Sequence, residues 1–235
     1  MLKRCVHHAL MLATAALLLS AGSALAEEKR ESFNAANART ATAAMDRDEA
    51  LLAASRLCPA DAFGKSVARR ARPPSGESAG SADCATHPEK CYRACVAGGP
   101  EHCFRLALAF QENEDVVAPR YAQRMFSMAC ALGEAAGCTN RAAHMRNGAD
   151  EGDPLKALSQ PEKDRCQFRS FKIACAKNDN WGCAMLGQAY SEGEGVRKNV
   201  KRARRYYLKS CRLDADFDAC AFARRARKQR LEARR

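Results

Sequence analysis

Thirteen cysteines are the residues of this 235-residue chain whose spacing says most about its chemistry. Eight of them form four pairs, with the partners eight residues apart in three pairs and nine apart in the fourth. The pairs are Cys95 and Cys103, Cys130 and Cys138, Cys175 and Cys183, and Cys211 and Cys220. Cysteines at such spacings either oxidise to disulfides or, together with histidine, bind zinc.

The zinc alternative rests on the segment around the first pair. His87 and His102 lie among Cys84, Cys91, Cys95 and Cys103, all within 20 residues. The paired spacing recurs elsewhere without such histidines, so we predict disulfides, no metal site and no other cofactor. The chain has no C-x-x-C and no C-x-x-C-H, so a thioredoxin-like redox role and covalent haem are unsupported.

An N-terminal export signal also favours disulfides over a zinc site. Residues 1–26 begin with two basic residues, continue with the apolar run Ala9 to Leu19, and end with the small-residue site Ala24-Leu25-Ala26, as in a signal peptide. Removal of Cys5 with this segment leaves twelve cysteines, an even number that suits disulfides in an oxidising compartment. We therefore expect a secreted or periplasmic protein with no transmembrane span after cleavage, a retained N-terminal anchor being the alternative.

The sequence around each pair predicts the end of one helix, a turn and the start of the next helix. Between Cys175 and Cys183 the turn contains Asn178, Asp179, Asn180 and Gly182, which accept turn geometry and left-handed conformations. Cysteines placed on either side of such a turn can come close enough to form a bridge. The residue before the first cysteine is always small, which allows the helices to approach closely: Ala94, Ala129, Ala174 and Ser210.

The bridged unit repeats along the chain. The first cysteines of the pairs follow one another at intervals of 35, 45 and 36 residues, and periods of this length with two helices each are typical of helical repeat proteins. The predicted fold class is therefore all-α, an α/α solenoid of about four antiparallel helix pairs, each bridged by a disulfide.

Two stretches carry a resemblance to a known family. Residues Gly182 to Val196, GCAMLGQAYSEGEGV, followed by Lys201 to Tyr207, KRARRYY, resemble the Sel-one-like repeat, a relative of the tetratricopeptide repeat. The paired cysteines are similar to those of the secreted, cysteine-rich branch of that family. The resemblance covers about residues 84–235, is stronger in the last two units, and implies a protein-binding α/α solenoid.

The same resemblance implies an alternative function, because some cysteine-rich members are described as penicillin-binding or β-lactamase-like proteins. The chain has no S-x-x-K and no H-E-x-x-H, motifs of serine and zinc hydrolases. Its one G-x-S-x-G match, Gly76 to Gly80, lies in a Pro-, Gly- and Ser-rich stretch that is typical of a linker. We therefore assign no catalytic residue, and a β-lactam-binding or β-lactam-hydrolysing envelope enzyme is the second hypothesis. We expect no acyl-enzyme on serine after incubation with a penicillin.

The segments outside the repeats are less regular. We expect residues 27–83 to be mostly flexible, apart from a short helix within Asp46 to Leu57, and residues 84–235 to form the repeat domain. The 45-residue interval holds an insertion at 147–164, which we interpret as an elongated loop. Four cysteines stay outside the pairs, and their connectivity is left open: Cys58, Cys84, Cys91 and Cys166.

Positive charge is concentrated at the C-terminal end. Residues 196–235 hold 15 Lys or Arg and four Asp or Glu, a net charge of +11 out of +12 for the whole chain. We expect Arg224 and Arg227 to occupy inward positions of the last helix. A solvated end cap would explain this composition, but charge of one sign also favours an anionic partner, a protein or an envelope ligand rather than nucleic acid. The basic binding end would contain Arg224, Arg225, Arg227, Lys228 and Arg230.

Overall fold

The structure is a computed structural model that describes residues 33–64, 83–148 and 152–232, with side chains described as far as Lys228. These residues form α-helices and one short 3-10 helix, and no strand occurs among them. The helices are α2 (Ala35–Met45), α3 (Glu49–Arg56), α4 (Pro59–Ala62), α5 (Pro88–Val96), α6 (Pro100–Glu112), α7 (Pro119–Ala131), α8 (Ala135–Arg146), η1 (Pro154–Ala157), α9 (Gln160–Ala176), α10 (Asn180–Glu192), α11 (Val200–Leu213) and α12 (Ala219–Glu232). The predicted all-α class is confirmed.

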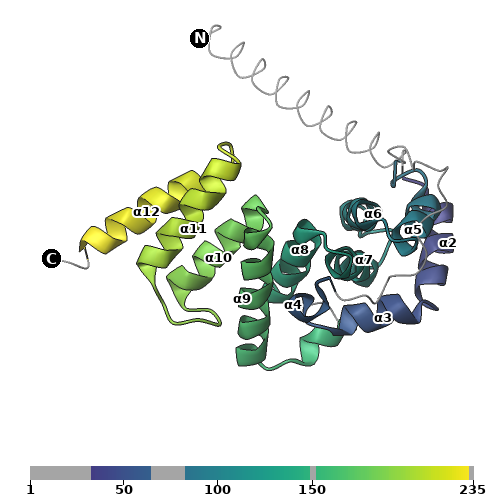
Figure 1. Ribbon diagram of the computed structural model, residues 1–235. Coiled ribbons are helices and arrows are strands. Elements are labelled where there is room, and N and C mark those ends of the chain that lie inside the picture. The colour runs from purple at the N-terminus through teal and green to yellow at the C-terminus, as the bar shows by residue number, and fades with distance from the viewer. Residues whose placement is uncertain (1–32, 65–82, 149–151, 233–235) are drawn as a thin grey trace, which may run out of the picture.

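From α5 onwards each helix packs against the next, so that the chain runs as a solenoid towards its C-terminal end (Figure 1). The structure brings the sulfur atoms of all four predicted pairs to bonding distance. These bridges join α5 to α6, α7 to α8, α9 to α10, and α11 to α12. The expected α/α solenoid of bridged helix pairs is confirmed.

The bridged turns are tight because small residues allow the two helices to touch. A Cβ atom added to Gly182 would lie 2.7 Å from the Cβ of Ala174, and one added to Gly137 would lie 2.7 Å from the Cβ of Ala129. Asn178 in the turn has a φ of 66°, the left-handed conformation expected from its type. Any larger side chain at these two glycines would separate the helices that the disulfide joins.

The N-terminal segment requires a correction. We expected residues 27–83 to be mostly flexible, but residues 33–64 form α2, α3 and α4, which pack on the repeats. α3 contacts α7, and α4 contacts α7, α8 and α9. The predicted short helix is confirmed as α3, whose N-cap Asp48 accepts a hydrogen bond from the backbone N–H of Leu51. The few apolar side chains, Met45 and Leu51 among them, are buried because the repeats complete their core.

The four remaining cysteines form two further bridges. Cys84 pairs with Cys91 at the start of α5, and Cys58 pairs with Cys166, 108 residues away on α9. The second bridge fastens the N-terminal helices to the middle of the solenoid. The sequence named these four residues but left their connectivity open, because only the tertiary fold brings Cys58 beside α9.

The loop formed by the 147–164 insertion is shorter than we expected. α9 begins within it at Gln160, after a capping box in which Ser159 and Glu162 bond each other's backbone N–H groups. Residues Pro154–Ala157 form η1, and Asp153 before it is buried. Of the 147–164 insertion, residues 149–151 lie outside the described residues, as do the predicted signal peptide and residues 65–82 of the linker.

Candidate interaction surface

The basic end of the protein is one face of α12. Arg224, Arg225, Arg227 and Lys228 are all exposed, and we call these four residues the basic face. At 100° per residue they occupy one side of the helix, opposite three buried alanines, Ala219, Ala223 and Ala226. The side chain of Arg230, the fifth predicted residue, is outside the described side chains.

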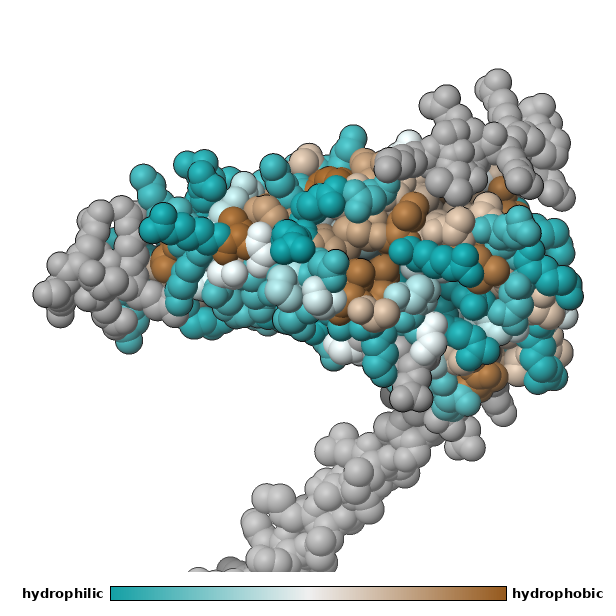
Figure 2. Space-filling view, turned by 90° about the horizontal axis from the view of Figure 1, so that it is seen from below, coloured by the Kyte–Doolittle hydropathy of each residue, from teal (hydrophilic) through white to brown (hydrophobic). Residues whose placement is uncertain are grey.

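This arrangement corrects the expectation that Arg224 and Arg227 point inward. Both are exposed, and Ala223 and Ala226 take the inward positions against α11. The arginines turn outward because no carboxylate lies within ion-pair distance of either guanidinium among the described residues, and burial of an unpaired charge is very unfavourable. Figure 2 shows a mostly hydrophilic surface towards this end of the molecule.

The preceding helix adds aromatic residues to this end. Tyr206 stacks on Tyr190 with the ring centroids 5.5 Å apart and the planes at 5°. The guanidinium of Arg202 lies 5.5 Å from the Tyr190 ring centroid. Tyr207, the neighbour of Tyr206, is buried and faces Phe222 of α12, with ring centroids 5.5 Å apart. Tyr206 therefore packs on α10, whereas Tyr207 lies between Gly187 of α10 and Phe222 of α12.

A pocket of about 240 Å³ opens between α10, α11 and α12. Its walls include Gln188, Ser191, Glu192, Tyr207, Phe222 and Arg225. Burial, followed by the charge of Glu192, raises the pKa of Tyr207 to about 12, so its hydroxyl keeps its proton at neutral pH. The pocket thus combines an arginine, a protonated phenol and an aromatic ring at the edge of the basic face.

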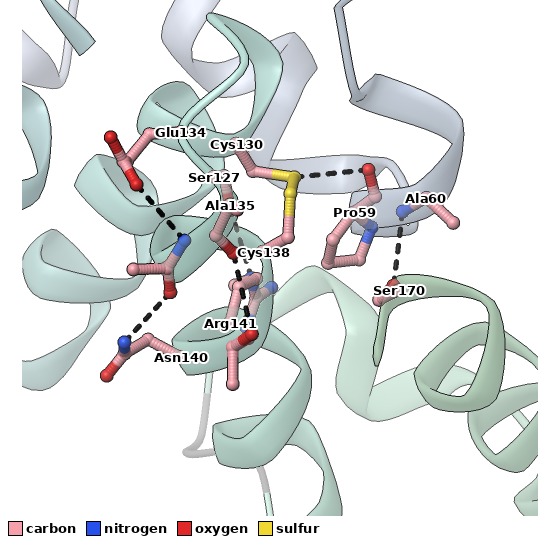
Figure 3. Close-up of a disulfide and its surroundings, with 12 residues drawn as sticks. Pro59, Ala60, Ser127, Cys130, Glu134, Ala135, Cys138, Asn140, Arg141 and Ser170 are labelled. Atoms are coloured by element: carbon pink, nitrogen blue, oxygen red, sulfur yellow. Dashed lines mark hydrogen bonds between the residues drawn. A yellow bond between two sulfur atoms is a disulfide. The ribbon is translucent and has the colours of Figure 1, made fainter. Parts of the chain in front are cut away.

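A second polar cluster lies in the interior and has no access to a large partner. Arg141 of α8 is 1% exposed, and its guanidinium donates to both carboxylate oxygens of Asp153 at 2.5 and 2.6 Å. It also donates to the Ser127 hydroxyl and to the backbone carbonyl of Ser55 in α3. Burial raises the pKa of Asp153, but the hydrogen bonds from Arg141 outweigh this and hold it below its usual value. This pair ties the insertion and the N-terminal helices to α8. Figure 3 shows Arg141 and Ser127 beside the Cys130–Cys138 bridge.

The buried serines are engaged in packing. Ser127 and Ser170 each donate a hydroxyl hydrogen bond to the carbonyl four residues earlier, and Ser55 to the one three residues earlier. Ser210 donates to the carbonyl of Asn180 in the neighbouring helix. Each of these protons is therefore directed at the backbone and not at a base that would activate the oxygen for acyl transfer.

The cysteines and histidines of the first pair do not assemble as a metal site. Cys84, Cys91, Cys95 and Cys103 are bonded to one another in two disulfides. Among the described residues, no group of three or more His, Cys, Asp or Glu side chains could hold a metal ion. Within the same residues, none of the helices is both long enough and apolar enough to cross a membrane.

The fold and its bridges define the protein as a disulfide-bridged α/α repeat protein. The family model of the Sel1 repeat matches two segments of the chain, residues 101–134 and 182–214. No curated protein and no solved structure matches the chain. The chain therefore carries Sel1 repeats, as the sequence resemblance predicted.

The matched segments also show how the bridges relate to the repeats. The first segment spans most of α6 and all of α7, and the second spans most of α10 and all of α11. The disulfides join α5 to α6, α7 to α8, α9 to α10 and α11 to α12, so each bridge connects the end of one such unit to the start of the next. The bridges consequently fix the angle between repeats, which sets the curvature of a solenoid.

Proposed function

We propose that this protein is an exported scaffold that binds an acidic segment of another protein through the basic face of α12. Sel1 repeats generally mediate protein–protein interactions, and six disulfides fit an oxidising compartment outside the cytoplasm. The predicted signal peptide supports export to the periplasm or the medium. Repeat solenoids bind partners along continuous surfaces, and the partner here is recognised by charge.

The observation that carries the proposal is the one-sided charge of α12. A terminal helix needs a polar outer face, and a mixture of acidic and basic side chains would supply it. The described exposed face instead carries only basic residues from Arg224 to Lys228. Like charges on one helix face repel one another, and an acidic partner removes this repulsion on binding.

The partner class can be tested with defined probes and the exported, oxidised protein. One probe is a dye-labelled peptide with six glutamates between glycine and serine residues, and its control carries glutamines in their place. The other probe is a vesicle of phosphatidylcholine with a fraction of phosphatidylglycerol. We expect the glutamate peptide to bind, the glutamine peptide to bind at least tenfold more weakly, and the affinity to fall as salt rises, because salt screens exposed charges within about 8 Å.

Binding of both peptides with equal affinity would contradict recognition by charge. Binding to the vesicles but not to the glutamate peptide would replace the protein partner with a lipid surface.

A further inference from the structure

The pocket between α10, α11 and α12 has a counterpart elsewhere in the solenoid. A pocket of about 210 Å³ lies between α6, α7 and α8. Gln111 lines that pocket and Ser191 lines the one beside α12, and each stands eight residues after the second cysteine of its bridge. The two pockets therefore occupy the same place between successive repeats.

The equivalent position on α8 holds an arginine that pairs with two glutamates at the end of α10. Arg146 stands eight residues after Cys138, and its guanidinium donates to Glu192 at 3.0 Å and to Glu194 at 2.8 and 2.9 Å. Glu192 also accepts a hydrogen bond from the side chain of Gln188 at 3.0 Å. The one carboxylate in the wall of the α12 pocket is thus already paired on its far side.

The arginine of the same pocket is held differently. The guanidinium carbon of Arg225 lies 4.5 Å from the ring centroid of Phe222, a stacking contact that keeps the guanidinium at the pocket. No carboxylate of the described residues forms an ion pair with it. A guanidinium fixed by an aromatic ring presents its two parallel N–H groups for bidentate contact with a carboxylate.

A further donor lines the pocket. The hydroxyl of Tyr207, whose pKa burial raises to about 12, keeps its proton at neutral pH and is hydrogen-bonded to the Ser191 hydroxyl. The Ser191 proton is engaged by the Tyr207 oxygen, so the Tyr207 hydroxyl and the stacked guanidinium form the set of donors, which suits an anion with two oxygens in one plane. The ring of Phe222 gives the carbon chain of such a group an apolar wall.

We infer that this pocket binds one carboxylate of the partner, from an aspartate or glutamate side chain or from a chain terminus, through Arg225 with Tyr207 as a second donor. The inference rests on the proposed function and deepens it. The basic face attracts an acidic segment without regard to its register, whereas the pocket selects one carboxylate of that segment and fixes its position. An Arg225 held by Phe222 therefore contributes more to affinity than an arginine of equal charge elsewhere on α12.

Two arginines of α12 give a matched test. Arg225→Gln and Arg224→Gln each remove one positive charge from the same helix, and only Arg225 lines the pocket. With the six-glutamate peptide, we expect Arg225→Gln to lower the affinity at least tenfold and Arg224→Gln to lower it less than threefold. Phe222→Leu, which changes no charge, should lower it severalfold, and Tyr207→Phe about threefold. Unchanged circular dichroism and thermal midpoints check that each variant folds.

The source of the carboxylate is tested with short peptides at millimolar concentration, followed by chemical shifts of α10–α12. One peptide carries a single glutamate and an amidated C-terminus, and another carries glutamine and a free C-terminus. A shift pattern that Arg225→Gln abolishes identifies which peptide fills the pocket.

Equal losses for Arg225→Gln and Arg224→Gln would overturn the pocket while leaving the basic face as the docking site. A variant with glutamine at all five positions is compared with the parent: Arg224, Arg225, Arg227, Lys228 and Arg230. Undiminished binding by this variant would overturn both the pocket and the basic face as docking sites.

Discussion

Arg141 and Arg224 both lie in the second turn of a helix that begins beside a bridging cysteine, yet one is buried and the other exposed. On α8 the insertion delivers Asp153, and α3 supplies a backbone carbonyl, so the guanidinium is satisfied in the interior. On α12 no described segment folds back over the helix, and the arginines face water. The same bridged turn therefore builds a covered region around α7–α9 and an open end at α12.

The difference separates stability from recognition. In the covered region, α2, α3 and α4 lie over the repeats, and a long-range disulfide and a buried ion pair hold them there. At the open end, a short bridge and three buried alanines hold α12, and its arginines Arg224, Arg225 and Arg227 are exposed. Substitutions in the covered region should therefore change the free energy of unfolding, and substitutions at the open end should change the affinity for the partner.

The largest effect on stability should come from the bridge between Cys58 and Cys166. Replacement of both by serine opens a loop with a sequence separation of 108 residues. Loop entropy then predicts a loss of about 4–5 kcal/mol in the free energy of unfolding. The control replaces Cys175 and Cys183, only eight apart, for which about 2–3 kcal/mol is expected. Chemical denaturation of the oxidised proteins gives both values, and an equal or smaller loss for the long bridge would contradict this account of the N-terminal helices.

Arg141→Met should cost about 3–5 kcal/mol, because it leaves the Asp153 carboxylate buried without its partner. Arg224→Met at the open end is the matched control and should change the free energy of unfolding by less than about 0.5 kcal/mol. Addition of Asp153→Asn to Arg141→Met should recover part of the loss, because no charge then remains unpaired. Similar losses for Arg141→Met and Arg224→Met in urea unfolding would remove the distinction between the two regions.

A smaller effect concerns the dependence of stability on acidic pH. The pKa of Asp153 is lowered in the fold, so the ion pair stabilises the protein above the unfolded-state pKa of about 3.9. This contribution is lost as the pH falls through the folded-state pKa. The free energy of unfolding of the parent protein should therefore drop more steeply below about pH 4 than that of the Arg141→Met, Asp153→Asn double variant. Parallel pH profiles would show that the pair does not contribute.

The repeats were predictable because their determinants are local. Eight-residue spacing between cysteines, a turn residue such as Asn178 and a small residue such as Ala174 all act within two adjacent helices. The class of fold and the bridged turns follow from them.

Contacts between distant segments were not predictable in the same way. The burial of residues 33–64 depends on a surface that the repeats supply, and the pairing of Arg141 with Asp153 depends on how the insertion folds back. The outward turn of Arg227 depends on the absence of a described partner over α12. For Arg141, a charged residue at a position that is Leu106 and Leu186 in other units was a signal of a buried counterion.

The most direct test of the docking account compares two variants of equal net charge. One replaces the predicted basic binding end with glutamine: Arg224, Arg225, Arg227, Lys228 and Arg230. The other replaces five exposed basic residues at the opposite end of the solenoid, in α2, α3, the turn between them and α5, with glutamine: Arg39, Arg47, Arg56, Lys90 and Arg93. The affinity of the six-glutamate peptide for each oxidised protein is measured at low salt. The account predicts at least a tenfold loss for the first variant and less than a twofold loss for the second, whereas equal losses would contradict it and leave net charge as the explanation.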